Sequence, residues 1–269
     1  MARTDVKEIT KRLEQGVKEV FESDKYKEYL SFMSKFTDYS FNNTMLIMLQ
    51  CPHASLVAGY KAWSTKFKRQ VRKGEKTIKI LAPCTHKKTI EKDGEEKEVA
   101  WTSFRAVNVF DISQTDGQEI PTACVENLTG DVDGYEALIK TLEGVSPVPV
   151  EYQNIDGGAN GFYSRAEERI AVQIGMSNLQ TVKTLIHEIS HAMLHGKDKE
   201  EGKADRLTRE VQAESVAYTV CSALGLDTSD YSFGYIAGWS SGKELKELSA
   251  SMDVICKTSK ALIERVKTF

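Results

Sequence analysis

The chain has 269 residues, of which 28% are charged and 41% are hydrophobic, and its formal net charge is −3. This composition is typical of a soluble globular protein with one large or two ordinary domains. The first twenty residues lack the apolar core of a signal peptide, and no stretch is long enough to span a membrane. Five scattered cysteines without a C-x-x-C pair fit a reducing compartment, so we expect a cytoplasmic protein without a membrane partner.

The small net charge conceals an asymmetry along the chain. Residues 1–130 contain 21 Lys and Arg against 18 Asp and Glu, whereas the remainder contains 15 against 21. Opposite signs in the two halves indicate two functional units. We place a first domain at residues 1–127 and a second at residues 128–269.

The first half begins with helical patterns and continues with strands. Apolar periodicity predicts four helices, at residues 6–21, 26–36, 42–49 and 60–67. Alternating residues then predict strands at 77–82 and 101–110, and the dipeptide Asp93-Gly94 between them favours a hairpin turn. We therefore expect helices followed by a small antiparallel sheet, and a linker over residues 121–133.

A basic and aromatic stretch lies at residues 59–79, with eight Lys and Arg against one acidic residue, Glu75. Cations that follow phosphates, combined with rings that stack on bases, are typical of single-stranded nucleic-acid binding. The alternative is that Trp63 and Phe67, four residues apart, form core and that the lysines are merely solvated. The residues predicted to contact nucleic acid are Tyr60, Lys61, Trp63, Lys66, Lys68, Arg69, Arg72, Lys73 and Lys76.

The second half mixes strands and helices. Its pattern predicts a helix at 135–142, strands at 148–152, 161–165 and 169–174, and later helices at about 203–224, 231–237 and 243–268. Residues 161–165 and 169–174 look like a strand pair. We expect the second of them to be an edge strand beside the active site, where an extended peptide can add as a further strand.

Residues 181–196 carry the strongest chemical signal, the pattern His187-Glu188-Ile189-Ser190-His191 in an apolar, proline-free stretch that ends at Gly196. On a helix, residues four apart share one face, so His187 and His191 can direct two imidazoles at one metal ion. Glu188 beside them can exchange a proton with a water on that metal, as in a zinc peptidase. The alternative, surface or core histidines without a metal, is weakened by the clustering.

A catalytic zinc site usually has three protein ligands, so a third must come from elsewhere. A second helical pattern offers Glu214, which is flanked by Ala213 and Ser215, and a carboxylate in such surroundings needs a partner. We choose Glu214 as the third ligand, with Glu210 as the competitor, either as ligand or as hydrogen-bond partner of a histidine. His195 is a further turn along the helix; we expect it to cap the helix end or to form a hydrogen bond nearby.

Several motifs occur in an order that resembles the ArdC-type antirestriction proteins. The N-terminal ones are Phe41-Asn-Asn-Thr-Met-Leu, Gly59-Tyr-Lys-Ala-Trp63, Val71-Arg-Lys-Gly-Glu-Lys76 and the stretch from Phe104 to Thr115. The C-terminal ones are the His187 to His191 pattern, Val211-Gln-Ala-Glu214 and Tyr235-Ile-Ala-Gly-Trp239. The resemblance covers nearly the whole chain.

The resemblance implies an α+β fold, with an N-terminal domain that binds single-stranded DNA and a zincin-like metallopeptidase domain. It implies Zn²⁺ as cofactor, a protein or peptide substrate, and a role on plasmids or conjugative elements in protecting incoming DNA. It also supports Glu214 as a ligand. Two alternatives remain open. One is a DNA-protecting protein without catalysis. The other is a peptidase that cleaves a repressor-type regulator, because the ending His191-x-x-x-His195 resembles the sequence of such peptidases more closely.

Overall fold

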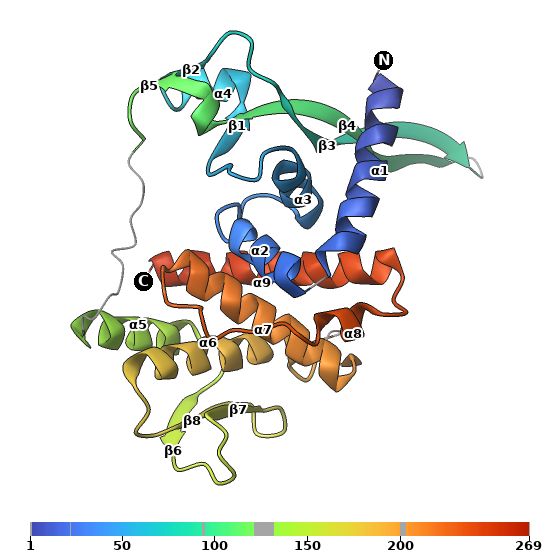
Figure 1. Cartoon of the computed structure of the whole chain (residues 1–269). Helices are drawn as coiled ribbons and strands as arrows, with labels where there is room; N and C mark the ends of the chain where they lie inside the picture. Colours follow the sequence, from blue (N-terminus) through green and yellow to red (C-terminus); the bar gives the residue numbers. More distant parts are fainter. Residues whose placement is uncertain (1, 22, 93–94, 121–131, 200–202, 269) are drawn as a thin grey trace. The chain divides into compact units, whose positions relative to one another are not determined.

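A computed structural model describes residues 2–21, 23–92, 95–120, 132–199 and 203–268 (Figure 1). It divides the chain into two compact units, Met1–Lys18 with Asn42–Pro121, and Glu19–Phe41 with Thr122–Phe269. The predicted boundary between residues 127 and 128, and the predicted turn at residues 93–94, lie outside the described residues.

The first unit combines helices with small antiparallel sheets. Strands β1, β4 and β3 form one sheet in the order β1-β4-β3, and β2 pairs with β5 in a second. The helices of this part of the chain are α1 (Ala2–Val20), α3 (Phe41–Gln50) and α4 (Tyr60–Thr65), with the 3-10 helix η1 (Ile112–Gln114). The strands are β1 (Val57–Gly59), β2 (Arg69–Val71), β3 (Ile78–Lys92), β4 (Glu95–Asp111) and β5 (Thr115–Gly117).

Side chains of α3 cover the outer edge of β3 at Lys79 and Leu81. The amide of Asn43 accepts from the Leu81 N–H and donates to its carbonyl, both at 2.9 Å. The amide of Gln50 bonds in the same way with Lys79, at 3.0 and 2.9 Å. Asn43 and Gln50 are seven residues apart, so they lie on one face of the helix. Two side-chain amides thereby occupy positions where a further strand would otherwise pair.

The second unit contains a three-stranded sheet and most of the helices. Strand β8 lies between β6, to which it is parallel, and β7, to which it is antiparallel. The strands are β6 (Val150–Gln153), β7 (Gly161–Ser164) and β8 (Arg169–Gln173). The helices are α2 (Ser23–Met33), α5 (Val132–Val145), α6 (Asn178–His195), α7 (Arg206–Ala223), α8 (Ile236–Ser240) and α9 (Leu245–Thr268).

The strand order corrects one sequence prediction. Residues 169–174 are not an edge strand, because β8 pairs on both sides and β6 and β7 form the two edges. Ile170, Ala171 and Val172 are fully buried. A continuous apolar run of this kind is typical of a central strand. The predicted pairing of residues 161–165 with 169–174 is correct.

Helix α6 is the central element of the second unit. It packs against α5 and α7 and against the strands β7 and β8, while α7 packs in turn against α9 and α2 (Figure 1). Apolar residues on several faces, among them Val182, Leu185 and Ile189, are fully buried and explain this position. The predicted α+β class is therefore confirmed. None of the described helices is long and apolar enough to cross a membrane.

Candidate metal centre and basic surface

The two histidines of the His187 to His191 pattern lie on α6 and face α7. Ser177 caps the helix by accepting a hydrogen bond from the Gln180 N–H. Ten residues later, His187 and His191 lie one turn apart, with their Nε2 atoms 3.1 Å from each other. The sequence pattern therefore brings two imidazole nitrogens to one point, as the helical spacing predicts.

Helix α7 brings two carboxylates to this point, and they contact different nitrogens. Oε2 of Glu210 lies 3.5 Å from Nε2 of His191 and 3.8 Å from Nε2 of His187. Oε2 of Glu214 lies 3.2 Å from Nδ1 of His187, on the opposite edge of that ring. Glu210 thus faces the space between the two histidines, whereas Glu214 lies behind one of them.

The donor set fits a metal ion. Atoms of His187, His191 and Glu210 lie within 4.8 Å of one another, so one ion can reach all three. Two imidazole nitrogens and a carboxylate oxygen are ligands that Zn²⁺ accepts, with a fourth position open. Each histidine is also held at its other nitrogen, His187 by Glu214 and His191 by His195. Such outer partners are typical of metal-binding histidines.

Nearby charges perturb the pKa values of these groups. Burial by itself lowers the pKa of His187, but the hydrogen bond to Glu214 and the nearby carboxylates outweigh it and raise that pKa. The hydrogen bond with His191 lowers the pKa of Glu210. The carboxylates therefore stabilise the charged form of His187, and His191 stabilises the ionised form of Glu210.

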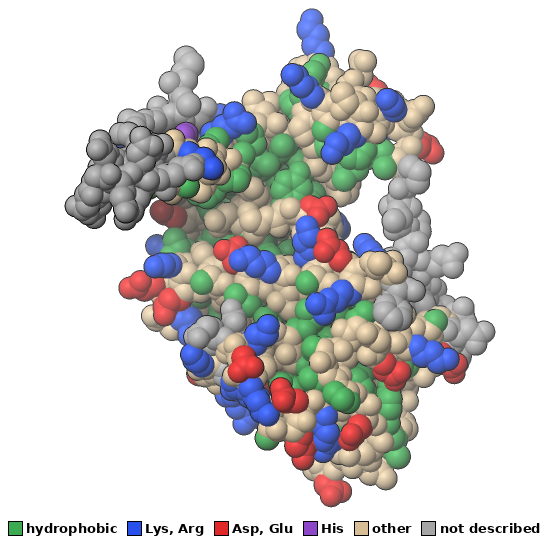
Figure 2. Space-filling model, turned by 180° about the vertical axis from the view of Figure 1, so that it is seen from behind, with side chains coloured by type: hydrophobic (Ala, Val, Ile, Leu, Met, Phe, Trp, Pro, Cys, Tyr) green, Lys and Arg blue, Asp and Glu red, His purple; other side chains and the backbone are tan. Residues whose placement is uncertain are grey.

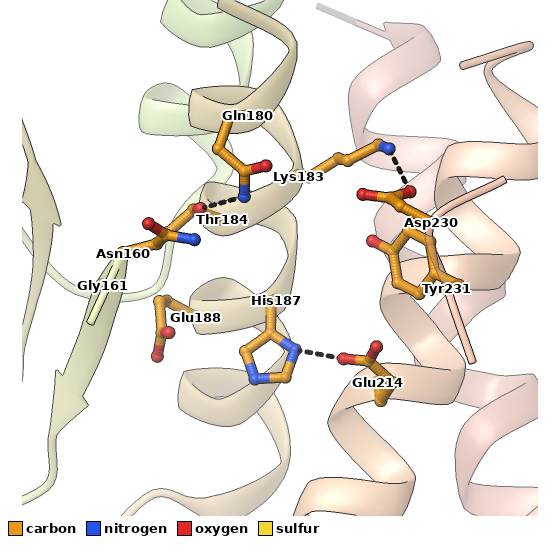
Figure 3. Close-up of a pocket in the computed structure, with 10 residues that line it drawn as sticks. All are labelled: Asn160, Gly161, Gln180, Lys183, Thr184, His187, Glu188, Glu214, Asp230 and Tyr231. Carbon is orange, nitrogen blue, oxygen red and sulfur yellow. Dashed lines mark hydrogen bonds and ion pairs between the residues drawn. The ribbon is translucent and has the colours of Figure 1, made fainter. Parts of the chain in front are cut away.

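Glu188 is 7% exposed and lies on the other side of His187 from Glu214 (Figure 3). Burial raises the pKa of its carboxyl, and His187 and His191 offset part of that effect. A raised pKa favours a group that both takes up and releases protons. Gly161, at the start of β7, allows the close approach, because a Cβ there would meet Thr184 at 2.6 Å and Glu188 at 3.3 Å.

His195 is 2% exposed and forms hydrogen bonds nearby, as expected. Its Nδ1 lies 2.9 Å from Nδ1 of His191, and its Nε2 lies 3.0 Å from Oε1 of Gln212 on α7. Burial lowers the pKa of His195 to about 4. His195 therefore contacts a candidate ligand from behind and does not itself face the space between the Nε2 atoms.

Two cavities flank the histidines. One, of about 270 Å³, extends past Lys183, Asp230 and Tyr231 (Figure 3). Lys183 is almost buried, and its Nζ lies 2.6 Å from Asp230. The other, of about 420 Å³, extends past the side chains of Tyr163, Arg165, Arg206 and Arg209. Both include His187 and Glu188, so a chain lying across the site could occupy both.

Sequence reasoning did not single out these lining residues as site residues. It also missed Tyr235. Burial raises the pKa of this tyrosine, and the charges of Glu214 and Glu210 raise it further, so its hydroxyl lies near these carboxylates. In the sequence, Tyr235 was noted only as the first residue of the motif Tyr235-Ile-Ala-Gly-Trp239, without a role at the site. Lys183, Asp230 and the arginines look like ordinary surface charges, and their convergence depends on tertiary structure.

In the first unit, three of the predicted nucleic-acid contacts are engaged internally. Trp63 is fully buried, its Nε1 donates to the Phe110 carbonyl at 3.0 Å, and its ring lies 5.0 Å from that of Phe67. Trp63 is therefore core and cannot stack on a base, which corrects that part of the prediction. Arg69 donates to Thr115, Gly117 and Gln118, and Arg72 pairs with Glu75 and Asp116.

The other predicted contacts are at the surface. Tyr60 is 63% exposed, and the exposed cations of this segment are Lys61, Lys66, Lys68, Lys73 and Lys76. These five lysines have no carboxylate partner in the part of the chain that the structure describes. Trp101 and Phe104 on β4 are also 49% and 58% exposed, and neither was predicted. Figure 2 shows Lys and Arg side chains on this unit with hydrophobic side chains exposed between them.

Known proteins match this chain in two ways: a family match covers its N-terminal part, and a similarity of fold covers most of its length. Residues 2–110 match the family described as the N-terminal domain of anti-restriction factor ArdC. Crystal structures of the antirestriction protein ArdC from plasmid R388 share the fold. The metal-free structure has a TM-score of 0.54 at 19% identity, with 85% of this chain and 84% of that chain covered. The Mn(II)-bound structure has a TM-score of 0.50 at 16% identity, with 89% and 96% covered.

A curated relative is an uncharacterized protein of Bacillus anthracis, 27% identical over 279 residues. The match covers 89% of this chain and 47% of the relative, so the chain spans about half of that protein's length. The N-terminal match and the fold over most of the chain agree with the motif order in the sequence. The resemblance is thereby confirmed: residues 2–110 match the ArdC N-terminal domain family, and the chain has the fold of the ArdC antirestriction protein.

Proposed function

We propose that this ArdC-like protein is a metal-dependent peptidase that acts in association with single-stranded DNA. The observation that carries the peptidase proposal is the convergence of the Nε2 atoms of His187 and His191 with a carboxylate oxygen of Glu210, with buried Glu188 alongside. The Mn(II)-bound ArdC structure supports a divalent metal. Among such metals, Zn²⁺ fits two imidazoles and one carboxylate best.

We assign the third ligand position to Glu210 and an orienting role to Glu214. Each imidazole has one nitrogen for the metal and one for a hydrogen bond. Glu214 accepts from Nδ1 of His187, which leaves Nε2 free to bind, and Glu210 is the carboxylate on the Nε2 side of both rings. The assignment exchanges the roles that the sequence gave to these two residues.

When bound, Zn²⁺ supplies Lewis acidity, which polarises a carbonyl and lowers the pKa of a coordinated water. Glu188 acts as the general base and returns the proton to the leaving amine, and its raised pKa suits both directions. The edge strand β7 offers backbone groups to an extended peptide, which would lie across Glu188 between the two cavities. The raised pKa of Tyr235 keeps its hydroxyl protonated as a hydrogen-bond donor near the carboxylates.

The peptidase test compares wild-type protein with Glu188→Gln on a mixed peptide library, with cleavage read by mass spectrometry. We expect the variant to bind zinc as wild type does and to lose cleavage by ~10²- to 10⁴-fold, since the general base is removed. Chelation should abolish wild-type cleavage, and added zinc should restore it. Cleavage by the variant at the wild-type rate would refute the role of Glu188.

The DNA-binding proposal depends on the exposed residues of the first unit. The five exposed lysines provide a path for phosphates, and Tyr60, Trp101 and Phe104 offer rings for stacking. We expect a labelled oligothymidylate to bind with an affinity that falls as salt rises. Binding that does not depend on salt would contradict a contact with phosphates.

A single pair of measurements separates the peptidase from a purely protective protein. If the biological effect is catalytic, Glu188→Gln should remove protection of single-stranded DNA in a conjugation assay while DNA binding persists. If the protein protects by coating the DNA, the same variant should protect as wild type does. Loss of DNA binding with cleavage intact would favour a peptidase directed at a regulator.

A further inference from the structure

His195 has no role in the proposed chemistry, yet it is 2% exposed and both of its ring nitrogens have partners. Its Nδ1 lies 2.9 Å from Nδ1 of His191, so a proton must lie between them. Only one of the two nitrogens can carry that proton, and the other must accept it. The direction of this hydrogen bond determines which nitrogen of His191 has a lone pair.

The partner of the other ring nitrogen of His195, Nε2, determines the direction of this hydrogen bond. Its Nε2 lies 3.0 Å from Oε1 of Gln212, and Nε2 of Gln212 donates to Oγ of Ser251 on α9 at 3.2 Å. An amide oxygen can only accept, so Nε2 of His195 carries the proton. In a neutral ring its Nδ1 is then the acceptor, and Nδ1 of His191 is the donor. The lone pair of His191 is left on Nε2, the atom that faces His187 and Glu210.

If these hydrogen bonds ran in the opposite direction, His191 could not bind a metal through Nε2. If the Gln212 amide were rotated, its NH₂ group would donate to Nε2 of His195, whose Nδ1 would then donate to His191. The proton of His191 would move to Nε2, and that atom could no longer bind a metal. His187 is different, because its partner Glu214, when ionised, can only accept. One histidine is therefore oriented by a charge, and the other by a chain of neutral groups that has two possible directions.

We infer that His195 and Gln212 are positioning residues: the chain from Ser251 through Gln212 and His195 holds His191 in the tautomer that binds metal. The inference rests on the proposed metal centre. It adds a connection from that centre to α9, because a metal on Nε2 of His191 fixes every hydrogen bond in the chain. It also gives a function to the histidine that follows the His187 to His191 pattern by one turn.

The first test measures tautomers directly in the full-length protein. Nitrogen-15 shifts of the histidine rings, recorded with and without zinc, should show His191 protonated on Nδ1 and His195 protonated on Nε2 in both states. A metal-free protein with the proton on Nε2 of His191 or Nδ1 of His195 would overturn the inference. This measurement depends neither on peptidase activity nor on a variant that folds.

The second test compares variants by zinc affinity, measured in competition with a chromophoric chelator. Gln212→Leu removes the acceptor and should weaken zinc binding by ~10- to 100-fold, the effect typical of lost outer partners. Gln212→Glu keeps an acceptor facing His195 and should retain wild-type affinity or exceed it. Thr219→Val is the matched control, because it removes a buried hydroxyl from the same helix α7 away from the histidines. We expect its affinity to be that of wild type.

The outcomes separate this inference from the proposed metal centre. Equal zinc affinity in Gln212→Leu and wild type, or equal loss in Gln212→Leu and Gln212→Glu, would refute the positioning role while leaving the metal site in place. A wild-type protein that binds no zinc would refute the metal centre itself. In that case the ring tautomers of the metal-free protein would still decide the direction of the chain.

Discussion

The candidate metal centre of the second unit and the basic segment of the first unit were both predicted from residue types, and they differ in how the structure uses those residues. In the metal centre, side-chain atoms of His187, His191 and Glu210 contact one another, and Glu214 contacts His187. In the basic segment, Trp63 is core and Arg69 and Arg72 bond to the protein itself, whereas Tyr60 and five lysines are exposed.

The difference follows from how each prediction was made. Histidines four residues apart on a helix have a fixed mutual geometry, so a spacing implies a direction in space. A run of cations and rings carries no such geometry. An arginine that closes a turn and an arginine that binds phosphate are identical in sequence, since both offer the same donors.

The largest expected effect is that of Trp63→Ala on stability, and it distinguishes an aromatic residue of the core from one at the surface. Removing a fully buried indole leaves a cavity and removes the hydrogen bond to the Phe110 carbonyl, so the free energy of unfolding should fall by about 3–5 kcal/mol. Denaturant unfolding measures this. Tyr60→Ala is the control, and it should leave stability almost unchanged while weakening DNA binding. A Trp63→Ala protein of normal stability that fails to bind DNA would return Trp63 to the contact surface.

The next effect distinguishes the two carboxylates of α7. Glu210→Gln removes the proposed ligand and should weaken zinc binding by more than ~100-fold, whereas Glu214→Gln removes only an orienting partner and should cost ~10- to 100-fold. Competition with a chelator gives both values. A larger loss in Glu214→Gln than in Glu210→Gln would restore Glu214 as the ligand.

A smaller effect is expected when surface lysines are removed. The variant Lys66→Ala, Lys73→Ala, Lys76→Ala should bind oligothymidylate more weakly, and the slope of log affinity against log salt should become shallower by ~0.7 for each lysine that contacts a phosphate. The control removes the same charge from the exposed face of α9, through Lys246→Ala, Lys257→Ala and Lys267→Ala. Equal effects of the two variants would show a general charge effect without a defined surface.

The smallest effect concerns the acid stability of the first unit. Burial alone would raise the pKa of Asp111, but hydrogen bonds from the backbone N–H groups of Ser113, Ser55 and Leu56 outweigh it and lower that pKa. A lowered folded-state pKa stabilises the fold above the ordinary Asp pKa, and this contribution is lost as pH falls through the folded-state value. Unfolding measured at decreasing pH should show this loss, and Asp111→Asn should reduce it. An unchanged pH dependence in that variant would contradict the assignment.

Much of the second unit could be predicted from the sequence, because its helices are long and periodic. The proposed exchange of roles between Glu210 and Glu214 could not, since both lie on the same face of α7 and only the side-chain contacts distinguish them. Residues 231–237 were predicted to form a helix, but α8 begins at Ile236. Tyr231 and Phe233 instead pack their rings against Tyr218, a tertiary contact that overrides local periodicity.

In the first unit the helices and the base of the β3–β4 hairpin were predicted, but the outer part of the hairpin, at residues 83–92 and 95–100, was not. Strands β1, β2 and β5 were not predicted either. Each has three residues, too few to show an alternating pattern. Their positions depend on pairing with residues distant in sequence, such as Arg69 with Gly117. Gly117 has φ 144°, and a Cβ there would lie 2.6 Å from the Lys68 carbonyl, so this position requires glycine.

The amides of Asn43 and Gln50 also have a consequence for assembly. An open strand edge is where a second copy of a chain most readily adds by backbone pairing, which leads to strand exchange and fibres. Because side-chain amides already bond to Lys79 and Leu81, a foreign strand would have to displace four hydrogen bonds before it could join β3 at this point. Asn43, which lies in the Phe41 to Leu46 motif, thereby opposes the addition of a foreign strand at this part of the sheet edge.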